Sequence, residues 1–439
     1  MTTRNLSTRT RFVLGLVVAT GALVGLATLD SFGLKDGPAG NPPAAAPRPT
    51  SPNVFDFGAV GDGKADDTAA IRRAIEAICT VDDGRSRARR LVVSPGTYRL
   101  TGTIVLTPEN NHLVIECPGG EARLVWDGPR GGNMIETWAQ RGLQMRDLVL
   151  DGAGKAGTLL RVNSTDGKHE NQYLKRFGQR AATAYTLERL KFMKADTGVS
   201  FGDESYINSD LCTLSHCGFS RLETGIRMKS VQNLGFFIPR PDFGYVGTAL
   251  WITGGGYVTV TLLNAHHTDV AIRLEGQGIN SGVFKFDGVR PEQGSRTPGK
   301  RPVLLMASGE TNVHLTAAQT TTGAIFGENG DLDTPAFILG PSANVVVESS
   351  HITGKVARLT GKADDVPTFL TIRNSRFRCG SDPRTGIEAD RFSGYRIVDS
   401  VVTVDDVRGK AYKVSGRVMI PEMVHLPKQA QGQPGYKAP

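Results

Sequence analysis

The sequence is poor in aromatic residues and lacks the short motifs of nucleotide-dependent enzymes and serine hydrolases. Only 7% of its 439 residues are Phe, Trp or Tyr, whereas glycine is abundant at 53 residues. This balance favours many short strands joined by tight turns over a bundle of helices. No P-loop, no G-x-S-x-G elbow and no dinucleotide-binding fingerprint occurs. Any chemistry must therefore come from another arrangement of side chains.

The chain also lacks a concentrated basic surface, although its formal net charge is +8. Residues 1–52 carry a net of +3, which leaves +5 for the remaining chain, and these basic residues are scattered. A nucleic-acid-binding surface usually shows clustered Lys and Arg with interleaved aromatic residues. The charge pattern therefore predicts no nucleic-acid partner.

Cysteine is scarce, and its count is odd. The five cysteines stand at positions 79, 117, 212, 217 and 379. An odd number cannot be fully paired within one chain. A disulfide between Cys79 and Cys117 is conceivable in an exported protein. The alternative is that the cysteines serve as small buried apolar side chains.

The first 52 residues are unlike the rest of the sequence. Residues 1–11 are basic, and residues 12–29 (FVLGLVVATGALVGLATL) form an apolar run close to the length that spans a bilayer. No small-x-small cleavage site follows directly, which favours an uncleaved transmembrane signal anchor over a signal peptide. Residues 30–52 are rich in Pro and Ala and predict an extended linker. We therefore expect the body to be exported, anchored at the membrane facing the periplasm or cell exterior, or secreted if the segment is cleaved.

After residue 90 the sequence repeats a pattern of short strands. Residues 187–201 (LERLKFMKADTGVSF) match residues 214–228 (LSHCGFSRLETGIRM) at an offset of 27, and weaker copies follow at intervals between 23 and 29 residues. Each copy holds two or three short alternating apolar runs and no helical stretch. Repeats of this length indicate a stacked architecture. The sequence predicts an all-β fold, a single-stranded right-handed parallel β-helix of about 10 coils.

We expect this β-helix domain over residues 53–415, followed by an extended tail over residues 416–439. The polar segment 165–185 interrupts the period and predicts a long loop thrown out from one coil. Near the start, Asp66 and Asp67 precede apolar positions at helical spacing, namely Ile71, Ala74, Ile75 and Ile78. The acids are expected to cap this helix, and the helix to plug the open end of the first coil.

The opening stretch also carries a family resemblance. Residues 54–71 fit the pattern V-x-D-F-G-A-x-G-D-G-x-x-D-D-T-x-A-I. The matching residues are Val54, Asp56-Phe57-Gly58-Ala59, Gly61-Asp62-Gly63, Asp66-Asp67-Thr68 and Ala70-Ile71. With the repeats, the chain resembles the right-handed β-helix superfamily of pectate lyases and polygalacturonases, in the rhamnogalacturonase/epimerase-like branch. The resemblance implies a substrate lying along the outside of one parallel sheet. The G-H-G motif of polygalacturonases is absent.

The repeat register places several polar residues in one outward row. Val199, Ile226, Leu250 and Ile272 are expected to point inward, so that Ser200, Arg227, Trp251 and Arg273 point outward, with Arg161 and Arg358 extending the row. An equivalent position lies three residues before each of these inward residues. It holds Asp196, Glu223, Gly247 and Asp269 in the four repeats. Trp251 offers a flat face for a sugar ring, and Arg227, Arg273 and Lys229 are expected to contact uronate carboxylates.

Asp196, Glu223 and Asp269 are the candidate catalytic residues. Carboxylates on neighbouring coils can act as acid and base, or share a hard cation such as calcium. The alternative is that acids before a Thr-Gly turn are ordinary turn residues. The His266-His267 pair lacks a third ligand at suitable spacing, so no metal site is assigned. Asp203-Glu204 is a reserve acid pair, and Asp287, Arg290 and Glu292 are a further candidate group.

These observations lead to two functional hypotheses. The first is an exported protein that cleaves an acidic, uronate-containing polysaccharide by lyase or hydrolase chemistry. The second is a non-catalytic glycan-binding or structural β-helix of the cell envelope. No cofactor is assigned, and the oligomeric state stays open.

Overall fold

A computed structural model describes the β-helix and its helical end. The described residues are 51–80, 89–164, 170–178, 180–202, 209–229, 232–276, 282–292, 294–296, 301–320, 334–363, 365–379, 386–405 and 411–414. The chain divides into two compact units, residues 1–50 and 51–439. The expected anchor at 12–29 and tail at 416–439 lie outside the described residues. Within the described part, no helix has the length and apolar character needed to cross a membrane.

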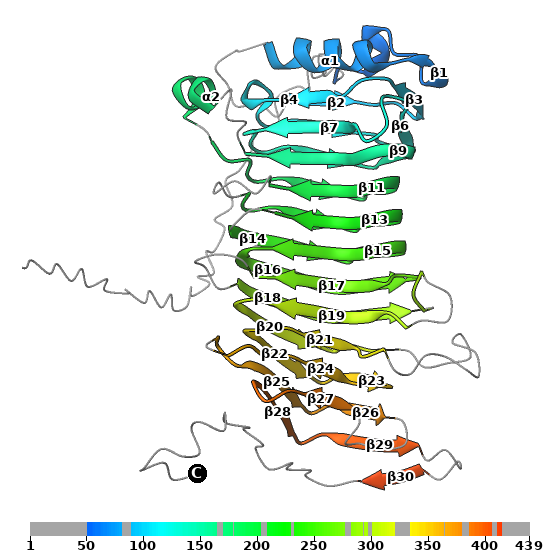
Figure 1. Cartoon of the computed structure of the whole chain (residues 1–439). Helices are drawn as coiled ribbons and strands as arrows, with labels where there is room; N and C mark the ends of the chain where they lie inside the picture. Colours follow the sequence, from blue (N-terminus) through cyan, green and yellow to red (C-terminus); the bar gives the residue numbers. More distant parts are fainter. Residues whose placement is uncertain are drawn as a thin grey trace, which may run out of the picture. The chain divides into compact units, whose positions relative to one another are not determined.

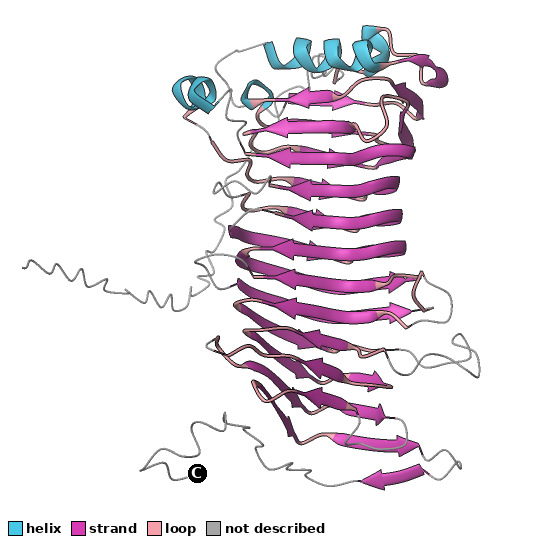
Figure 2. Ribbon diagram, viewed as in Figure 1, coloured by secondary structure: helices cyan, strands magenta, loops and turns pink. Residues whose placement is uncertain are grey.

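The structure is a parallel β-solenoid, as the repeats predict, with strands stacked coil upon coil (Figures 1 and 2). Each coil passes through three faces, which we call A, B and C in chain order. Strands of face A are β2 (Arg89–Val92), β5 (Leu113–Glu116), β8 (Gln144–Arg146), β10 (Thr186–Glu188), β12 (Thr213–Ser215), β14 (Gln232–Pro239), β20 (Thr311–Thr316), β22 (Ala343–Glu348), β25 (Thr368–Arg373) and β28 (Ser393–Val398).

Some strands turn a corner and serve two faces. Faces A and B share β16 (Gly255–His266) and β18 (Gly282–Glu292), and faces B and C share β9 (Leu148–Asn163), β11 (Lys191–Phe201), β13 (Gly218–Met228) and β15 (Asp242–Thr253). Face B also contains β1 (Asp62–Asp66), β3 (Gly96–Leu100), β6 (Ala122–Trp126), β23 (His351–Thr353), β26 (Arg376–Cys379) and β29 (Val401–Asp405). Face C is completed by β4 (Ile104–Leu106), β7 (Asn133–Trp138), β17 (Val270–Glu275), β19 (Val303–Ser308), β21 (Phe337–Leu339), β24 (Ala357–Leu359) and β27 (Ile387–Ala389). The last described strand, β30 (Ala411–Val414), pairs antiparallel with β29.

The register read from the repeats is confirmed by the strand pairing. Leu187 pairs with Leu214 and Phe192 with Phe219, which is the offset of 27 seen in the sequence. Pairing at this offset stacks identical side chains inside the solenoid. The rings of Phe192, Phe219 and Phe243 stack with centroids 5.0 and 4.8 Å apart. The buried ring stack therefore holds β11, β13 and β15 in one register.

The corner between faces A and B repeats one backbone conformation on ten successive coils, from β8 onward. The residues at this corner have φ between 45° and 73°, the left-handed region: Asp147, Arg189, His216, Arg240, Leu262, Gly288, Ala317, Ser349, Asn374 and Asp399. For residues other than Gly this conformation costs roughly 1–2 kcal/mol each. In the last coils the next residue is a buried serine, and the amide N–H groups of Ser350 and Ser375 donate to the hydroxyls of Ser375 and Ser400. Hydrogen bonds between coils thus stabilise the bend.

A helical segment lies at the first end of the solenoid (Figure 1). It comprises a short 3-10 helix, η1 (Val54–Phe57), and α1 (Thr68–Thr80). The apolar face of α1, with Ile71, Ala74 and Ile75, is buried in the same core as the first coils. A second 3-10 helix, η2 (Pro108–Asn110), follows β4. The apolar spacing of the sequence therefore marks the buried face of α1.

The clustered aspartates of the opening stretch build the turn into α1. The Asp67 carboxylate accepts hydrogen bonds from the amide N–H groups of Val60 and Gly61 at 2.6 and 3.2 Å. Asp66 accepts from the backbone and hydroxyl of Thr68 and from the hydroxyl of Thr101. Burial works to raise the pKa of Asp66, but these hydrogen bonds outweigh it and hold the pKa at about 2. Asp67 thus binds the preceding turn, where a helix-capping contact was expected.

The interrupting segment 165–185 is not a simple loop. It contains α2 (Glu170–Phe177), whereas the sequence predicts a long loop here. Arg176 of α2 forms an ion pair with Glu109 of η2. The helix has a strongly polar composition, so its sequence shows no clear helical spacing of apolar residues.

The described cysteines are free. Cys79 and Cys117 form no disulfide, and Cys117, Cys212 and Cys217 are buried among apolar side chains. Burial raises the pKa of the Cys212 and Cys217 thiols to about 12. The structure therefore favours the interpretation of these residues as small apolar side chains.

Candidate functional site

The outward row on face C has the register that the repeats predict. Ser200 pairs with Arg227, Arg227 with Trp251, and Trp251 with Arg273, on consecutive coils. Their neighbours Val199, Ile226, Leu250 and Ile272 are buried. Arg161 extends the row on the other side of Ser200. Arg358 lies in the same row, but Met306 and Ile338 separate it from Arg273.

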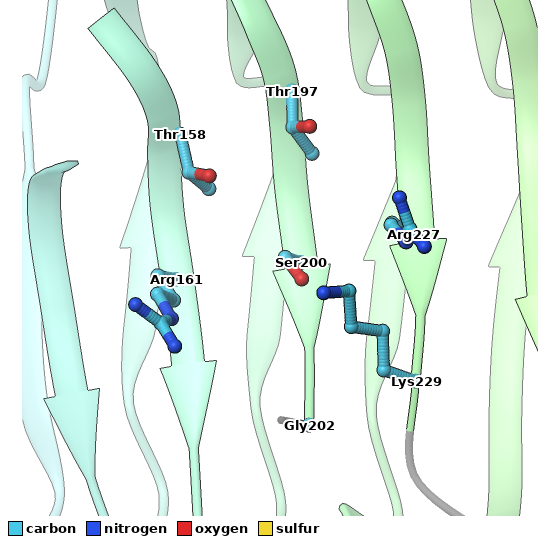
Figure 3. A pocket seen from close by; sticks show the side chains of 7 residues that line it. All are labelled: Thr158, Arg161, Thr197, Ser200, Gly202, Arg227 and Lys229. Carbon is cyan, nitrogen blue, oxygen red and sulfur yellow. The ribbon is translucent and has the colours of Figure 1, made fainter. Parts of the chain in front are cut away.

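A cavity of about 240 Å³ lies over this row at β9, β11 and β13. We call it the cationic pocket; its lining residues are Thr158, Arg161, Thr197, Ser200, Gly202, Arg227 and Lys229. Figure 3 shows the side chain of Lys229 extending from the end of β13 toward Ser200. The described lining residues therefore bring three cationic groups and three hydroxyls to the pocket, and none of these described residues is acidic.

One wall of the cationic pocket is fixed by a polar network. Arg161 lies 3.6 Å from the Glu136 carboxylate and donates from Nε to Asn163 Oδ1 at 3.2 Å. Asn163, which is fully buried, donates to Glu136 at 3.1 Å. Since Arg161 is held from two sides, its guanidinium is pre-organised at the pocket wall.

Trp251 does not offer an open ring face. The guanidinium carbon of Arg227, on the preceding coil, lies 3.8 Å from the ring centroid, and that of Arg273, on the following coil, lies 4.2 Å from it. Glu275 accepts from Trp251 Nε1 at 3.0 Å and from Arg273 Nε at 2.8 Å. A sugar ring could stack on Trp251 only if it displaced one of these arginines, because both faces hold arginines. The indole orients these two cations.

The three candidate acids lie at equivalent positions at the corner between faces B and C. Pairing on either side aligns Asp196 with Glu223, Glu223 with Gly247, and Gly247 with Asp269. Asp196 is exposed and forms no hydrogen bond or ion pair with another described residue. Glu223 and Asp269, in contrast, are bound to the same arginine.

That arginine is Arg296, from the segment after β18. It binds both Glu223 oxygens, at 2.8 and 2.9 Å, and its Nε lies 3.2 Å from Asp269. A Cβ added at Gly247 would lie 3.1 Å from Arg296 Nη2. The glycine between the two acids thus leaves the space through which the guanidinium passes.

Arg296 changes the chemistry open to these acids. Its hydrogen bonds lower the pKa of Glu223, and the same contact raises the pKa of Arg296. A general acid at neutral pH needs a raised pKa, so this pairing disfavours Glu223 as a proton donor. A guanidinium also stands where a calcium ion would bridge Glu223 and Asp269, so these residues do not fit that ion. Among the described residues, no group of three His, Cys, Asp or Glu gathers as a metal site.

The weaker candidates remain apart from the cationic pocket. His266 lies 3.9 Å from Asp242, and His267 stacks on Tyr245, both on face B or its corner. Arg290 and Glu292 form an ion pair on face B. Asp287 accepts from the Thr316 hydroxyl on face A. Asp203-Glu204 lies outside the described residues.

Sequence reasoning missed Arg296 and Glu275. Arg296 is 73 residues from Glu223, and the repeat pattern gives no signal for a contact from an irregular segment. The one sequence feature that relates to Arg296 is Gly247. It is a glycine at the position where the equivalent repeats have Asp196, Glu223 and Asp269. Glu275 lies two residues after Arg273, at a position that the alternation also directs outward.

The opening coils match a known family. Residues 51–114 fit the family model described as rhamnogalacturonase A/epimerase, pectate lyase-like. A stretch of 111 residues of this chain is 35% identical to the mannuronan C5-epimerases AlgE5 and AlgE2 of Azotobacter vinelandii. That match covers 23% of this chain and spans about a tenth of each relative, 11%.

The solved structures that match this chain are more distant in sequence. DFA-IIIase from Arthrobacter chlorophenolicus A6 has a TM-score of 0.47 at 13% identity, covering 81% of this chain and 93% of that one. An exopolygalacturonase from Thermotoga maritima has a TM-score of 0.41 at 13% identity, covering 84% and 95%.

Proposed function

We propose that this protein binds an acidic, uronate-containing polysaccharide along face C and acts on it as an enzyme. The observation that carries the proposal is the cationic pocket, where Arg161, Arg227 and Lys229 line one cavity with three hydroxyls. Guanidinium groups bind carboxylates in charge-assisted, often bidentate hydrogen bonds. The similarity of residues 51–114 to carbohydrate-active enzymes supports the substrate class.

The pocket suits chemistry that begins at the carbon next to a carboxylate. When cations neutralise a uronate carboxylate, they stabilise the negative charge that develops as the C5 proton leaves. Breaking the C4–O bond then gives lyase products, whereas return of the proton to the other face gives epimerisation. Hydrolysis instead needs a proton-donating carboxyl with a raised pKa, and Glu223 has a lowered one. We therefore favour lyase-type chemistry over hydrolysis.

The residue roles follow from these positions. Arg161, Arg227 and Lys229 bind the carboxylate, while Trp251 holds Arg227 and Arg273 in place along the row. Among the three predicted catalytic acids, we propose Asp196 as the acid/base group, since it starts the face C segment of β11 next to the pocket residue Thr197. We assign a structural role to Glu223 and Asp269. Their ion pairs with Arg296 would fix the corner between faces B and C and so orient the strands of face C.

Incubation with defined polysaccharides tests the proposal. The full chain would be mixed with polygalacturonate, polymannuronate and a neutral glucan, and three products would be followed: unsaturated uronates by absorbance, new reducing ends, and C5 inversion by NMR. We expect product from a polyuronate only, and its loss in Asp196→Asn with binding retained. Glu223→Gln serves as the matched acid control and should keep most of the activity. Full activity in Asp196→Asn would remove its role, and products from the neutral glucan alone would refute the substrate class.

A non-catalytic glycan-binding role is the second candidate. One observation favours it: two of the three candidate acids, Glu223 and Asp269, are ion-paired with Arg296. A binding module would retain polyuronate affinity and release no product from any polysaccharide in the same assay.

We also propose that residues 12–29 anchor the protein in a membrane and that the solenoid is exported. The proposal rests on the apolar run and the basic residues before it. Fractionation of cells, followed by protease treatment of intact cells, tests it: the solenoid should be in the membrane fraction and accessible from outside. Recovery of the chain in the cytoplasmic fraction would contradict it.

A further inference from the structure

A second cavity lies at the corner between faces B and C, outside the row that forms the cationic pocket. It measures about 590 Å³ and is lined by Arg221, Glu223, Tyr245 and Arg296. We call it the Tyr245 pocket. Its residues come from β13, β15 and the segment after β18, so that two neighbouring coils and one irregular segment build it.

Tyr245 presents an accessible aromatic face in this pocket. The side chain is 51% exposed. On one side its ring stacks on His267 of the following coil, with centroids 4.4 Å apart and planes 18° apart. Arg221 holds the equivalent position on the preceding coil, and both Arg221 and Tyr245 line the cavity. Trp251 differs, since arginines cover both of its faces.

The backbone under Tyr245 is tightly fixed. Tyr245 has a φ of 57° and Arg221 a φ of 55°, so both side chains project from the same left-handed corner. The preceding residue, Gly244, packs beneath His266: a Cβ there would lie 2.4 Å from His266 Nε2. A ring held by stacking and by a strained corner loses little conformational freedom when a ligand binds.

The described charges in and beside the Tyr245 pocket balance. Arg221, Arg296 and Glu223 line the cavity, and Asp269, which is not a lining residue, forms an ion pair with Arg296. Arg221 offers N–H donors. Glu223, whose side chain is 66% exposed, offers carboxylate lone pairs beyond those that Arg296 uses. Donors and acceptors beside an aromatic face match the hydroxyls and the apolar face of a sugar ring.

We propose that the Tyr245 pocket is a second saccharide-binding site, which takes an uncharged pyranose. The ring lies on the open face of Tyr245, while adjacent hydroxyls accept from Arg221 and donate to Glu223. The balanced charge means that the site gains nothing from a carboxylate, unlike the cationic pocket. This inference concerns binding only, and it stands or falls independently of catalysis at the cationic pocket.

Isothermal titration of the full chain tests the proposal with four probes: maltohexaose, cellohexaose, mannohexaose and hexagalacturonate. At least one neutral hexamer should bind, and Tyr245→Ala should weaken that binding at least about tenfold, whereas Tyr245→Phe should stay within about twofold. The matched control is Tyr257→Ala, which removes a 60% exposed aromatic from face A and should change nothing.

Two results would overturn the second site. One is that no neutral hexamer binds the unmodified chain. The other is that Tyr245→Ala binds the neutral hexamer as well as the unmodified chain does. Thermal melting of each variant shows whether the fold is kept. Hexagalacturonate binding that is lost in Arg161→Ala and kept in Tyr245→Ala reports on the cationic pocket alone, so failure of one site does not hide the other.

Discussion

The cationic pocket and the Glu223–Arg296–Asp269 cluster share only strand β13, and they differ in electrostatic character. In the pocket, Arg161 of β9 and the cations Arg227 and Lys229 at the end of β13 line one cavity, and none of the described lining residues is acidic. In the cluster, two acids of the repeat are neutralised by an arginine that is not part of it. The comparison shows that the strand register determines the direction in which a side chain points. Its charge state and reactivity also depend on contacts with residues outside the repeat, such as Arg296.

The largest expected effect concerns the core that supports both regions. Phe219 lies in β13, which also carries Arg227 and Glu223, and its ring stacks between Phe192 and Phe243. Phe219→Ala should lower the free energy of unfolding by about 3–5 kcal/mol through lost burial and a residual cavity. Denaturant unfolding measures this, with Phe55→Ala, an exposed ring, as the control. A loss below about 1 kcal/mol would mean that the ring stack does not hold the coils together.

Removing one cation from the cationic pocket should weaken the binding of an acidic ligand. Arg161→Ala should weaken hexagalacturonate binding by about 10- to 100-fold, since a hydrogen bond to a charged group contributes about 1.5–3 kcal/mol. Arg358→Ala is the matched control, because Arg358 lies in the same outward row five coils beyond the pocket's last strand, β13. Equal losses in both variants would indicate general attraction to a basic face.

Trp251 should act on the pocket indirectly. Trp251→Ala removes the ring between Arg227 and Arg273 and should weaken hexagalacturonate binding by about two- to tenfold, in line with a cation–π contribution of about 0.5–1 kcal/mol. Because the indole faces are covered, the same change should leave binding of neutral hexamers unaffected. Titration with both ligands measures the two losses of affinity. A larger loss of affinity for the neutral ligand would indicate that a sugar ring stacks on Trp251.

The smallest effect is expected at the Arg296 cluster, and it depends on pH. The folded state lowers the pKa of Glu223 below its usual 4.5. The stabilisation is therefore present above the unfolded pKa and is lost as pH falls through the lowered folded value. Because Glu223 is largely exposed, the pair should contribute less than about 1 kcal/mol. Thermal unfolding of Arg296→Ala should differ from the unmodified chain at pH 7 and converge with it below about pH 4; a constant difference would contradict the pairing.

Gly247→Ala tests the geometry of the same cluster. Its Cβ would lie close to the Arg296 guanidinium and 2.7 Å from the Glu223 carbonyl oxygen. We expect it to reproduce the loss of the Arg296 variant and to add a steric clash with that carbonyl oxygen. Stability equal to that of the unmodified chain would show that Arg296 does not need this space.

The sequence predicts the parts of this molecule that repeat. The offset between Phe192 and Phe219 and the row from Ser200 to Arg273 follow from periodicity, since the strands pair one coil apart. Arg296 and the helix α2 lie in irregular segments, where no period constrains the chain. The ring faces of Trp251 could not be judged either, because alternation gives the direction of a side chain and not its stacking partners.

The most direct test of the central claim compares hexagalacturonate with its carboxyl-reduced, neutral analogue in the Tyr245→Ala chain. In that background the Tyr245 pocket does not contribute, and only the charge of the ligand changes. Our account predicts that the reduced analogue binds at least about 100-fold more weakly, and that Arg161→Ala narrows this ratio to about tenfold or less. Equal affinity for the two hexamers would contradict the assignment of face C as a uronate-binding surface.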